Sequence, residues 1–196
     1  MFIIALEYFV LASTFTLAKE VLSYAPYLFL LTVRFSVGGL LLVGAAAVLK
    51  KFSLSALWRD KWLFLAVSFL HIYFAFVLEF WALQYTTSSK AALYYALTPF
   101  FSAGFSYFFY TERLSRRQWA GMALAVFGIL PLVTDVSSVQ LAFPVLPDLV
   151  LLAAVLSATL AWFVVKHLMN RGHHLVVVNG IAMVVGSVLC GVTMFC

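Results

Sequence analysis

Charged residues are scarce in this chain of 196 residues, and their scarcity excludes an ordinary water-soluble fold. Asp, Glu, Lys and Arg make up 10% of the sequence, whereas hydrophobic residues make up 65% and the mean hydropathy is +1.09. Soluble domains contain about 25% charged residues. The formal net charge of +5 comes from short turns rather than from one basic face, so it does not indicate nucleic-acid binding. The composition indicates a polytopic membrane protein.

Cysteine is equally rare, and the motifs of catalysis are missing. Cys190 and Cys196 lie in one apolar stretch and would face different sides of a helix, so an internal disulfide is not expected. The sequence has no G-x-x-x-x-G-K-S/T loop for ATP and no nucleophile–base or metal-ligand pattern. For His167, His173 and His174 we favour a solvated turn over a metal site, because the cluster lacks Cys or carboxylate partners. We therefore expect no enzyme activity, catalytic residue, cofactor or metal ion.

What the chain does have is seven apolar stretches, each close to the length of a bilayer crossing. A hydrocarbon core of about 30 Å needs roughly 20 apolar residues in a helix. The expected spans are residues 2–18, 27–49, 62–84, 91–110, 118–134, 149–165 and 175–196. The runs are continuous rather than alternating, which excludes a β-barrel. The predicted fold class is an all-α, polytopic transmembrane helix bundle.

Basic residues are distributed unevenly between the two sets of turns. The turns after the second, fourth and sixth spans hold Lys50, Lys51, Arg59, Lys61, Arg113, Arg116, Arg117, Lys166 and Arg171. The opposite turns hold only Lys19 and Lys90, which we expect to snorkel to the membrane surface. Because cytoplasmic loops are enriched in Lys and Arg, the first set and the N-terminus are predicted to be cytoplasmic.

A shift of the chain by 147 residues reveals a weak internal repeat. It places Lys19 on Lys166 and Gly39 on Gly186, with apolar residues matching around them. The shift covers five spans, an odd number, so the second copy would insert with opposite topology, as in many secondary transporters. We expect a first repeat over 1–134, a linker over 135–148 and an incomplete second repeat over 149–196. The sequence is then expected to be a fragment or truncated product of a ten-span protein.

Three motifs carry a family resemblance. Residues 82–86 read Ala-Leu-Gln-Tyr-Thr, residues 97–101 read Leu-Thr-Pro-Phe-Phe, and residues 111–121 read Thr-Glu-Arg-Leu-Ser-Arg-Arg-Gln-Trp-Ala-Gly. These segments resemble the EamA-type domain of the drug/metabolite transporter superfamily, with Thr111 where that family often has Gly and Lys90 where small residues are usual. The resemblance implies ten helices in two inverted repeats, a central substrate cavity and no covalent catalysis. It also places the protein in a plasma membrane, here expected to be a bacterial inner membrane.

Ionisable groups inside spans are the first candidates for substrate binding, because each costs roughly 2.5–3.5 kcal/mol to insert. They are Glu7, Arg34, His71 and Glu79. Arg34 and Glu79 lie at similar depths, about 10 Å and 5 Å below the outer face, so that a pair across the second and third spans is within reach. That pair has a structural and a substrate-binding interpretation, and so has Glu7; for His71 we favour a structural role over a proton relay.

The fourth span adds a polar stripe to these candidates. Its members recur at helical spacing and include Tyr94, Tyr95, Thr98 and Ser102. Pro99 lies within the stripe, so a kink is expected there. The stripe can line a cavity or pack against another helix.

We expect a secondary transporter of small organic metabolites that works by alternating access. The aromatic residues and the charges of both signs in the spans favour a zwitterionic solute with a flat ring, such as an amino acid or S-adenosylmethionine. The alternatives are a membrane-embedded enzyme acting on lipid, or an inactive half that needs a partner, for example in a homodimer.

Overall fold

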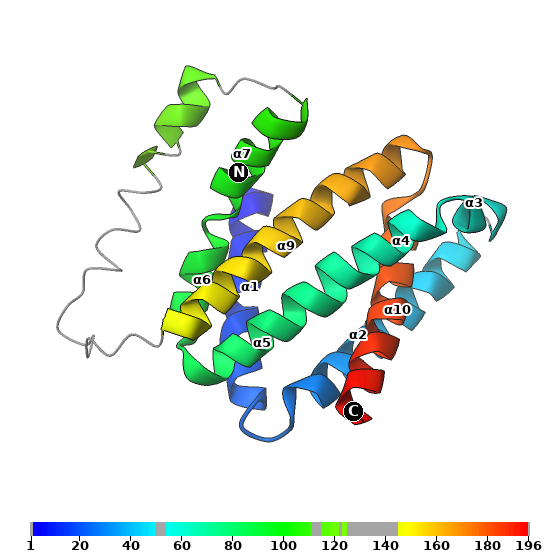
Figure 1. Ribbon diagram of the computed structural model, residues 1–196, viewed down its shortest axis with the longest axis horizontal. Helices are drawn as coiled ribbons and strands as arrows, with labels where there is room; N and C mark the ends of the chain where they lie inside the picture. The colour runs from blue at the N-terminus through cyan, green and yellow to red at the C-terminus, as the bar shows by residue number, and fades with distance from the viewer. Residues whose placement is uncertain (1, 50–53, 111–114, 122, 125–144, 196) are drawn as a thin grey trace.

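The computed structural model describes residues 2–49, 54–110, 115–121, 123, 124 and 145–195, and every regular element among them is a helix (Figure 1). The elements are α1 (Phe2–Val21), α2 (Tyr27–Val48), α3 (Leu54–Arg59), α4 (Lys61–Val67), the π-helix η1 (Ser68–Phe74), α5 (Ala75–Tyr85), α6 (Ser88–Tyr95), α7 (Thr98–Tyr110), α9 (Val145–Asn170) and α10 (Leu175–Phe195). The all-α fold class is confirmed.

Four of the described helical stretches are long and apolar enough to cross a membrane: Tyr27–Val48, Lys61–Tyr85, Leu146–Asn170 and Leu175–Phe195. They correspond to the second, third, sixth and seventh expected spans. The first expected span is the 20-residue helix α1, and the fourth is divided between α6 and α7. Most of the expected span 118–134 lies outside the described residues.

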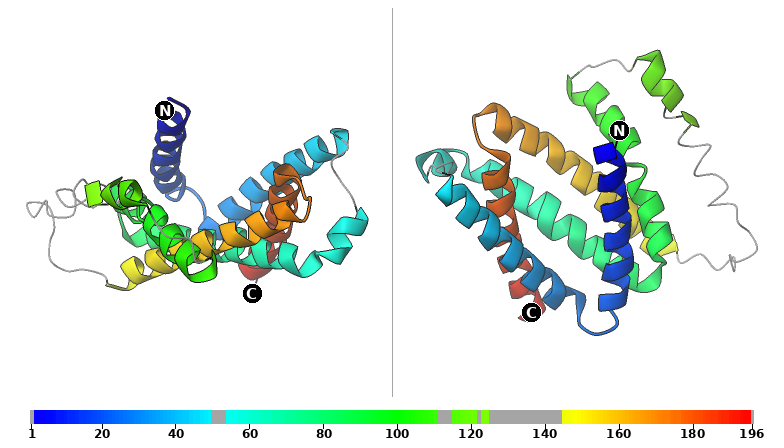
Figure 2. Two further views of the ribbon diagram at one scale, coloured as in Figure 1. Left: turned by 90° about the horizontal axis from the view of Figure 1, so that it is seen from above. Right: turned by 180° about the vertical axis from the view of Figure 1, so that it is seen from behind.

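The helices form one curved layer with α1 projecting from it. The continuous stretch α4–η1–α5 packs against α9 on one side and, through η1, against α10 on the other (Figure 1). Helix α2 lies along α10, whereas α6 and α7 lie at the opposite edge next to α9. Helix α1 contacts α6 and α5 and stands out from the layer in Figure 2.

The packing of α2 on α10 depends on residues without side chains. A Cβ atom added to Gly39 would lie 2.8 Å from the backbone nitrogen of Val184, and one added to Gly180 would lie 3.1 Å from that of Val43. Contact positions therefore rise along α2 as they fall along α10, so the two helices are antiparallel. Small residues allow this close backbone approach, as is usual in membrane bundles.

The outer surface of the layer is apolar. Phe108 is 86% exposed and Leu41 69% exposed, and many other large hydrophobic side chains are similarly uncovered. Soluble monomers rarely expose apolar patches of this extent. In a bilayer these side chains face lipid, which agrees with the composition.

A capping box lies at the start of the helical residues 116–121. The hydroxyl of Ser115 accepts the backbone N–H of Gln118 at 3.3 Å, and the Gln118 side chain accepts the backbone N–H of Ser115 at 2.7 Å. This reciprocal pair is the capping box that the sequence Ser-x-x-Gln predicts.

Candidate functional site

A buried polar contact inside the bundle joins the third and fourth expected spans. Glu79 on α5 is 5% exposed, and its carboxylate accepts a hydrogen bond from the hydroxyl of Tyr95 at the end of α6. The ring of Phe15 on α1 packs on Tyr95 with 5.2 Å between ring centroids. Three helices thus converge on one carboxylate. A buried charge of this kind is costly and marks a candidate for binding or coupling.

The break between α6 and α7 determines where Tyr95 lies. Pro99 has no N–H to donate to the carbonyl of Tyr95 four residues earlier, so the α-helix cannot continue. The hydroxyl of Thr98 donates to that carbonyl instead, at 2.6 Å. The kink predicted from Pro99 is confirmed, as a full break at residues 96 and 97. Two predicted site residues, Tyr95 and Thr98, therefore act together to orient the hydroxyl toward Glu79.

Arg34 and Glu79, whose depths would allow a pair, form no ion pair among the described side chains. No nitrogen of Arg34 lies within 4.0 Å of the Glu79 carboxylate, and the guanidinium instead lies over the rings of Phe76 and Phe35, at 5.6 Å and 6.0 Å from their centroids. Depth alone suggested the pair, and packing places the Arg34 guanidinium on aromatic rings instead, where cation–π attraction stabilises it.

A π-helix interrupts the third span at the position of His71. The hydroxyl of Ser157 on α9 donates to the carbonyl of Leu70 in this π-helix at 2.7 Å. The His71 ring meets the edge of the Trp162 ring at 5.2 Å, and its buried Nδ1 atom has no hydrogen-bond partner among the described residues. Such π-bulges are frequent at functional sites. Sequence reasoning missed Trp162 and Ser157, because neither residue is unusual in an apolar helix.

The two tyrosines of the stripe diverge. Tyr95 turns toward Glu79, whereas Tyr94 interacts with Asp148 at the start of α9. The ammonium of Lys90 pairs with the same Asp148 carboxylate at 2.8 Å. Lys90 therefore joins α6 to α9, which corrects the expectation that it only snorkels.

Lys19 also does more than snorkel. Its ammonium donates to the carbonyls of Leu83 and Gln84, at 2.6 Å and 3.2 Å. These carbonyls belong to the last turn of α5, where a cation satisfies unpaired acceptors and the helix dipole.

The remaining candidates are less informative. Ser102 is half-buried on α7. Glu7 belongs to α1, but its side chain lies outside the described residues.

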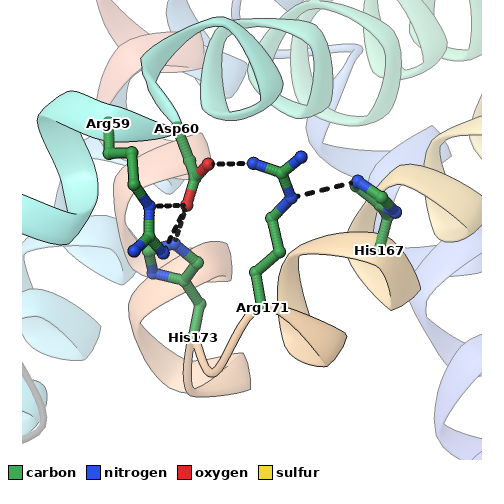
Figure 3. A network of polar contacts seen from close by, with 5 residues as sticks. All are labelled: Arg59, Asp60, His167, Arg171 and His173. Carbon is green, nitrogen blue, oxygen red and sulfur yellow. Dashed lines mark hydrogen bonds and ion pairs between the residues drawn. The ribbon is translucent and has the colours of Figure 1, made fainter.

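A second polar cluster lies at one end of the bundle, and sequence reasoning missed it (Figure 3). Asp60, between α3 and α4, is 3% exposed and binds Arg171 at 2.5 Å, His173 at 2.8 Å and Arg59 at 3.1 Å. His167 accepts a hydrogen bond from Arg171 at 3.1 Å. The hydrogen bond from His173, followed by those from Arg171 and Arg59, lowers the pKa of Asp60 well below its usual range. The expected solvated turn is therefore wrong for His173, whose side chain is 6% exposed.

Similarity to known proteins identifies the family of this chain. Residues 1–134 match the EamA-like transporter family. The chain belongs to this family. Since the match covers more than half of the chain, the predicted resemblance is confirmed, and the chain is a multi-pass membrane protein. Membership of this family points to transport rather than to enzymatic chemistry.

Two relatives of this chain have names that state what they transport. The chain is 29% identical over 194 residues to an S-adenosylmethionine/S-adenosylhomocysteine transporter of Chlamydia trachomatis serovar L2, and the match covers 96% of the chain and 59% of that relative. It is 28% identical over 197 residues to the transporter of the same name from Chlamydia muridarum, covering 96% of the chain and 61% of the relative. The chain thus spans about three fifths of these relatives. No solved structure matches it significantly.

Proposed function

We propose that this chain is part of a secondary transporter that carries S-adenosylmethionine or a closely related solute by alternating access. The observation that carries the proposal is the buried Glu79–Tyr95 pair beside the broken fourth span, in a chain of the EamA-like family. Broken helices and intramembrane carboxylates are typical of substrate and ion sites in secondary transporters. The names of the chlamydial relatives support this cargo class.

The chemistry of the proposed cargo fits the groups around this pair. S-adenosylmethionine carries a sulfonium, an ammonium, a carboxylate and a purine ring. Glu79 offers a negative charge for the cationic groups, and Arg34 offers a positive charge for the carboxylate. The rings of Phe76 on α5, His71 on η1 and Trp162 on α9 form a series of edge contacts, with 6.5 Å and 5.2 Å between ring centroids, and offer faces and edges for a purine. The unpartnered Nδ1 of His71 adds one polar group for the ring.

The antiparallel contact of α2 with α10 supports the inverted repeat on which alternating access depends. In the predicted repeat these two helices are equivalent, and an axis in the membrane plane relates equivalent helices with opposite direction. We propose accordingly a first repeat over 1–134 and the start of a second over 149–196, with the N-terminus in the cytoplasm of a bacterial cell.

Transport by the purified protein, expressed from its complete gene and placed in liposomes, tests the proposal. We expect uptake of radiolabelled S-adenosylmethionine that is accelerated by internal S-adenosylhomocysteine and only weakly inhibited by methionine or adenosine alone. The variant Arg34→Gln should weaken uptake more for S-adenosylmethionine than for an analogue whose carboxylate is amidated. If the protein took up amino acids but did not respond to either adenosyl compound, the proposed cargo would be rejected and the transport activity would be kept. If no solute crossed the membrane, both the cargo and the transport activity would be rejected.

A further inference from the structure

The Asp60 cluster joins segments that lie far apart in the sequence. Asp60 precedes α4, whereas its partners Arg171 and His173 occupy the turn between α9 and α10. Asp60 lies inside the region that matches the family, and both partners lie beyond it, in the predicted second repeat. The contact therefore bridges the two predicted repeats at one end of the bundle.

The turn is shaped so that two side chains reach one carboxylate. Gly172, between Arg171 and His173, has a φ of +89°, a conformation that costs little only for glycine. The chain reverses there, and both oxygens of Asp60 are engaged: Oδ1 by Arg171 and Oδ2 by His173 (Figure 3). The His173 ring also meets the edge of the Phe64 ring on α4, with 5.0 Å between centroids. The side chain of Asp60 is completely covered as a result.

The contact also lies on the face of the membrane where it can control access. Arg59, Lys61, Lys166 and Arg171 cluster at this end, which the distribution of basic residues assigns to the cytoplasm. Helices α4, α9 and α10 cannot separate at this face without exposing the Asp60 carboxylate and its partners. This contact between charged and hydrogen-bonded groups is either formed or broken. It can therefore distinguish two conformations of the protein.

We propose that Asp60, Arg171 and His173 form a cytoplasmic latch, which holds the inner ends of α4 and the α9–α10 turn together in one conformation of the transport cycle and is broken in the other. This proposal rests on the proposed function, because a latch between repeats has a role only if the repeats move. It differs from a static turn contact, which would remain formed throughout the cycle.

Distances between spin labels test the latch without a solute. In a background with Cys190→Ala and Cys196→Ala, labels at Trp58→Cys and Met169→Cys flank the cluster, and both native side chains are exposed at 65% and 46%. In liposomes we expect a dominant short distance. Asp60→Asn should reduce the ratio of short to long distances by about tenfold or more, the factor that corresponds to loss of a charge-assisted hydrogen bond. The pair Trp58→Cys with Leu65→Cys lies on one side of the latch and should not change.

His173→Gln keeps the test decisive if Asp60→Asn fails to fold, because it removes one partner and leaves Arg171 in place. It should shift the same ratio in the same direction by a smaller factor. An unchanged distance distribution in a folded variant would overturn the latch, whatever solute the protein carries. Because no solute is present, this result is independent of the cargo.

A reversible cross-link across the Asp60 cluster gives a second test of the latch. The labelling pair Trp58→Cys with Met169→Cys, in the same background, places two thiols beside the cluster and keeps all three latch residues. A short, cleavable bismaleimide should stop transport in this variant, and cleavage should restore it. Full transport with the cross-link in place would also overturn the latch.

Discussion

Two buried carboxylates among the described residues, Asp60 and Glu79, are held in opposite ways. Asp60 lies at a turn and has three basic or imidazole partners within 3.1 Å, two of them from a turn more than 100 residues away. Glu79 lies inside the third span, where Tyr95 donates its hydrogen bond and Arg34 remains outside ion-pair distance. The first carboxylate has its charge matched by the protein itself. The second has a neutral donor and an incomplete set of partners.

This difference separates the roles that the two sites can have. A matched buried charge contributes to holding segments together, and removing a partner is costly because a charge is left without compensation. An unmatched one has interaction capacity left for a cation or a proton from outside the protein. We therefore expect changes at Glu79 to affect transport first, and changes at Asp60 to affect the arrangement of the helices first.

The largest effect is expected from Glu79→Gln. The amide keeps the shape and can still accept a hydrogen bond from Tyr95, but it removes the charge offered to a cationic solute. Charge-assisted hydrogen bonds contribute about 1.5–3 kcal/mol, so transport of S-adenosylmethionine should fall by about tenfold to a hundredfold. Initial uptake rates in liposomes at equal protein content measure this.

The matched control is Glu20→Gln, which removes an exposed carboxylate from α1. It should leave uptake nearly unchanged. Equal losses in both variants would show that Glu79 has no special role and that the two carboxylates do not differ as described.

The next largest effect is expected from Tyr95→Phe, and it is a loss of stability. The variant deletes the hydroxyl that donates to Glu79 and leaves a buried acceptor without that partner. The expected cost is about 1–3 kcal/mol, equivalent to a fall of about 2–12 °C in the unfolding midpoint of a chain of this size. Thermal unfolding in detergent measures it. Tyr107→Phe, at a residue that is 59% exposed, should shift the midpoint far less.

The distance along the chain between interacting residues explains what the sequence could and could not predict. Apolar run length located the helices and Pro99 located the break, because each signal is local. The Asp60 cluster was missed and His173 was misjudged as solvated, because their contact joins residues 113 positions apart. Arg34 and Glu79 were matched by depth, which a sequence supplies, whereas packing determines that Arg34 contacts Phe76 and Glu79 contacts Tyr95.

Redundancy around Asp60 predicts a small effect for Arg59→Gln. The Arg59 side chain is 62% exposed, and Asp60 keeps Arg171 and His173 without it. Exposed ion pairs contribute little, so the midpoint should fall by at most about 3 °C. Arg171→Gln should lower it further in the same assay. If Arg59→Gln were the more damaging change, the cluster would depend on its exposed member rather than on the contact between repeats.

The smallest effect is expected from mild acid, and its sign follows from the partners of Asp60. The groups that face or adjoin this carboxylate are Arg59, Lys61, Arg171 and His173, with His167 behind Arg171. Since the folded-state pKa of Asp60 is lowered from its ordinary value of 3.8, its contribution to stability is fully present above that value and is lost only as the pH falls through the lowered pKa. The difference in unfolding midpoint between the unmodified protein and Asp60→Asn should therefore not shrink between pH 7 and pH 5, and a difference that shrinks over this range would show that the carboxylate is not held by its cationic partners.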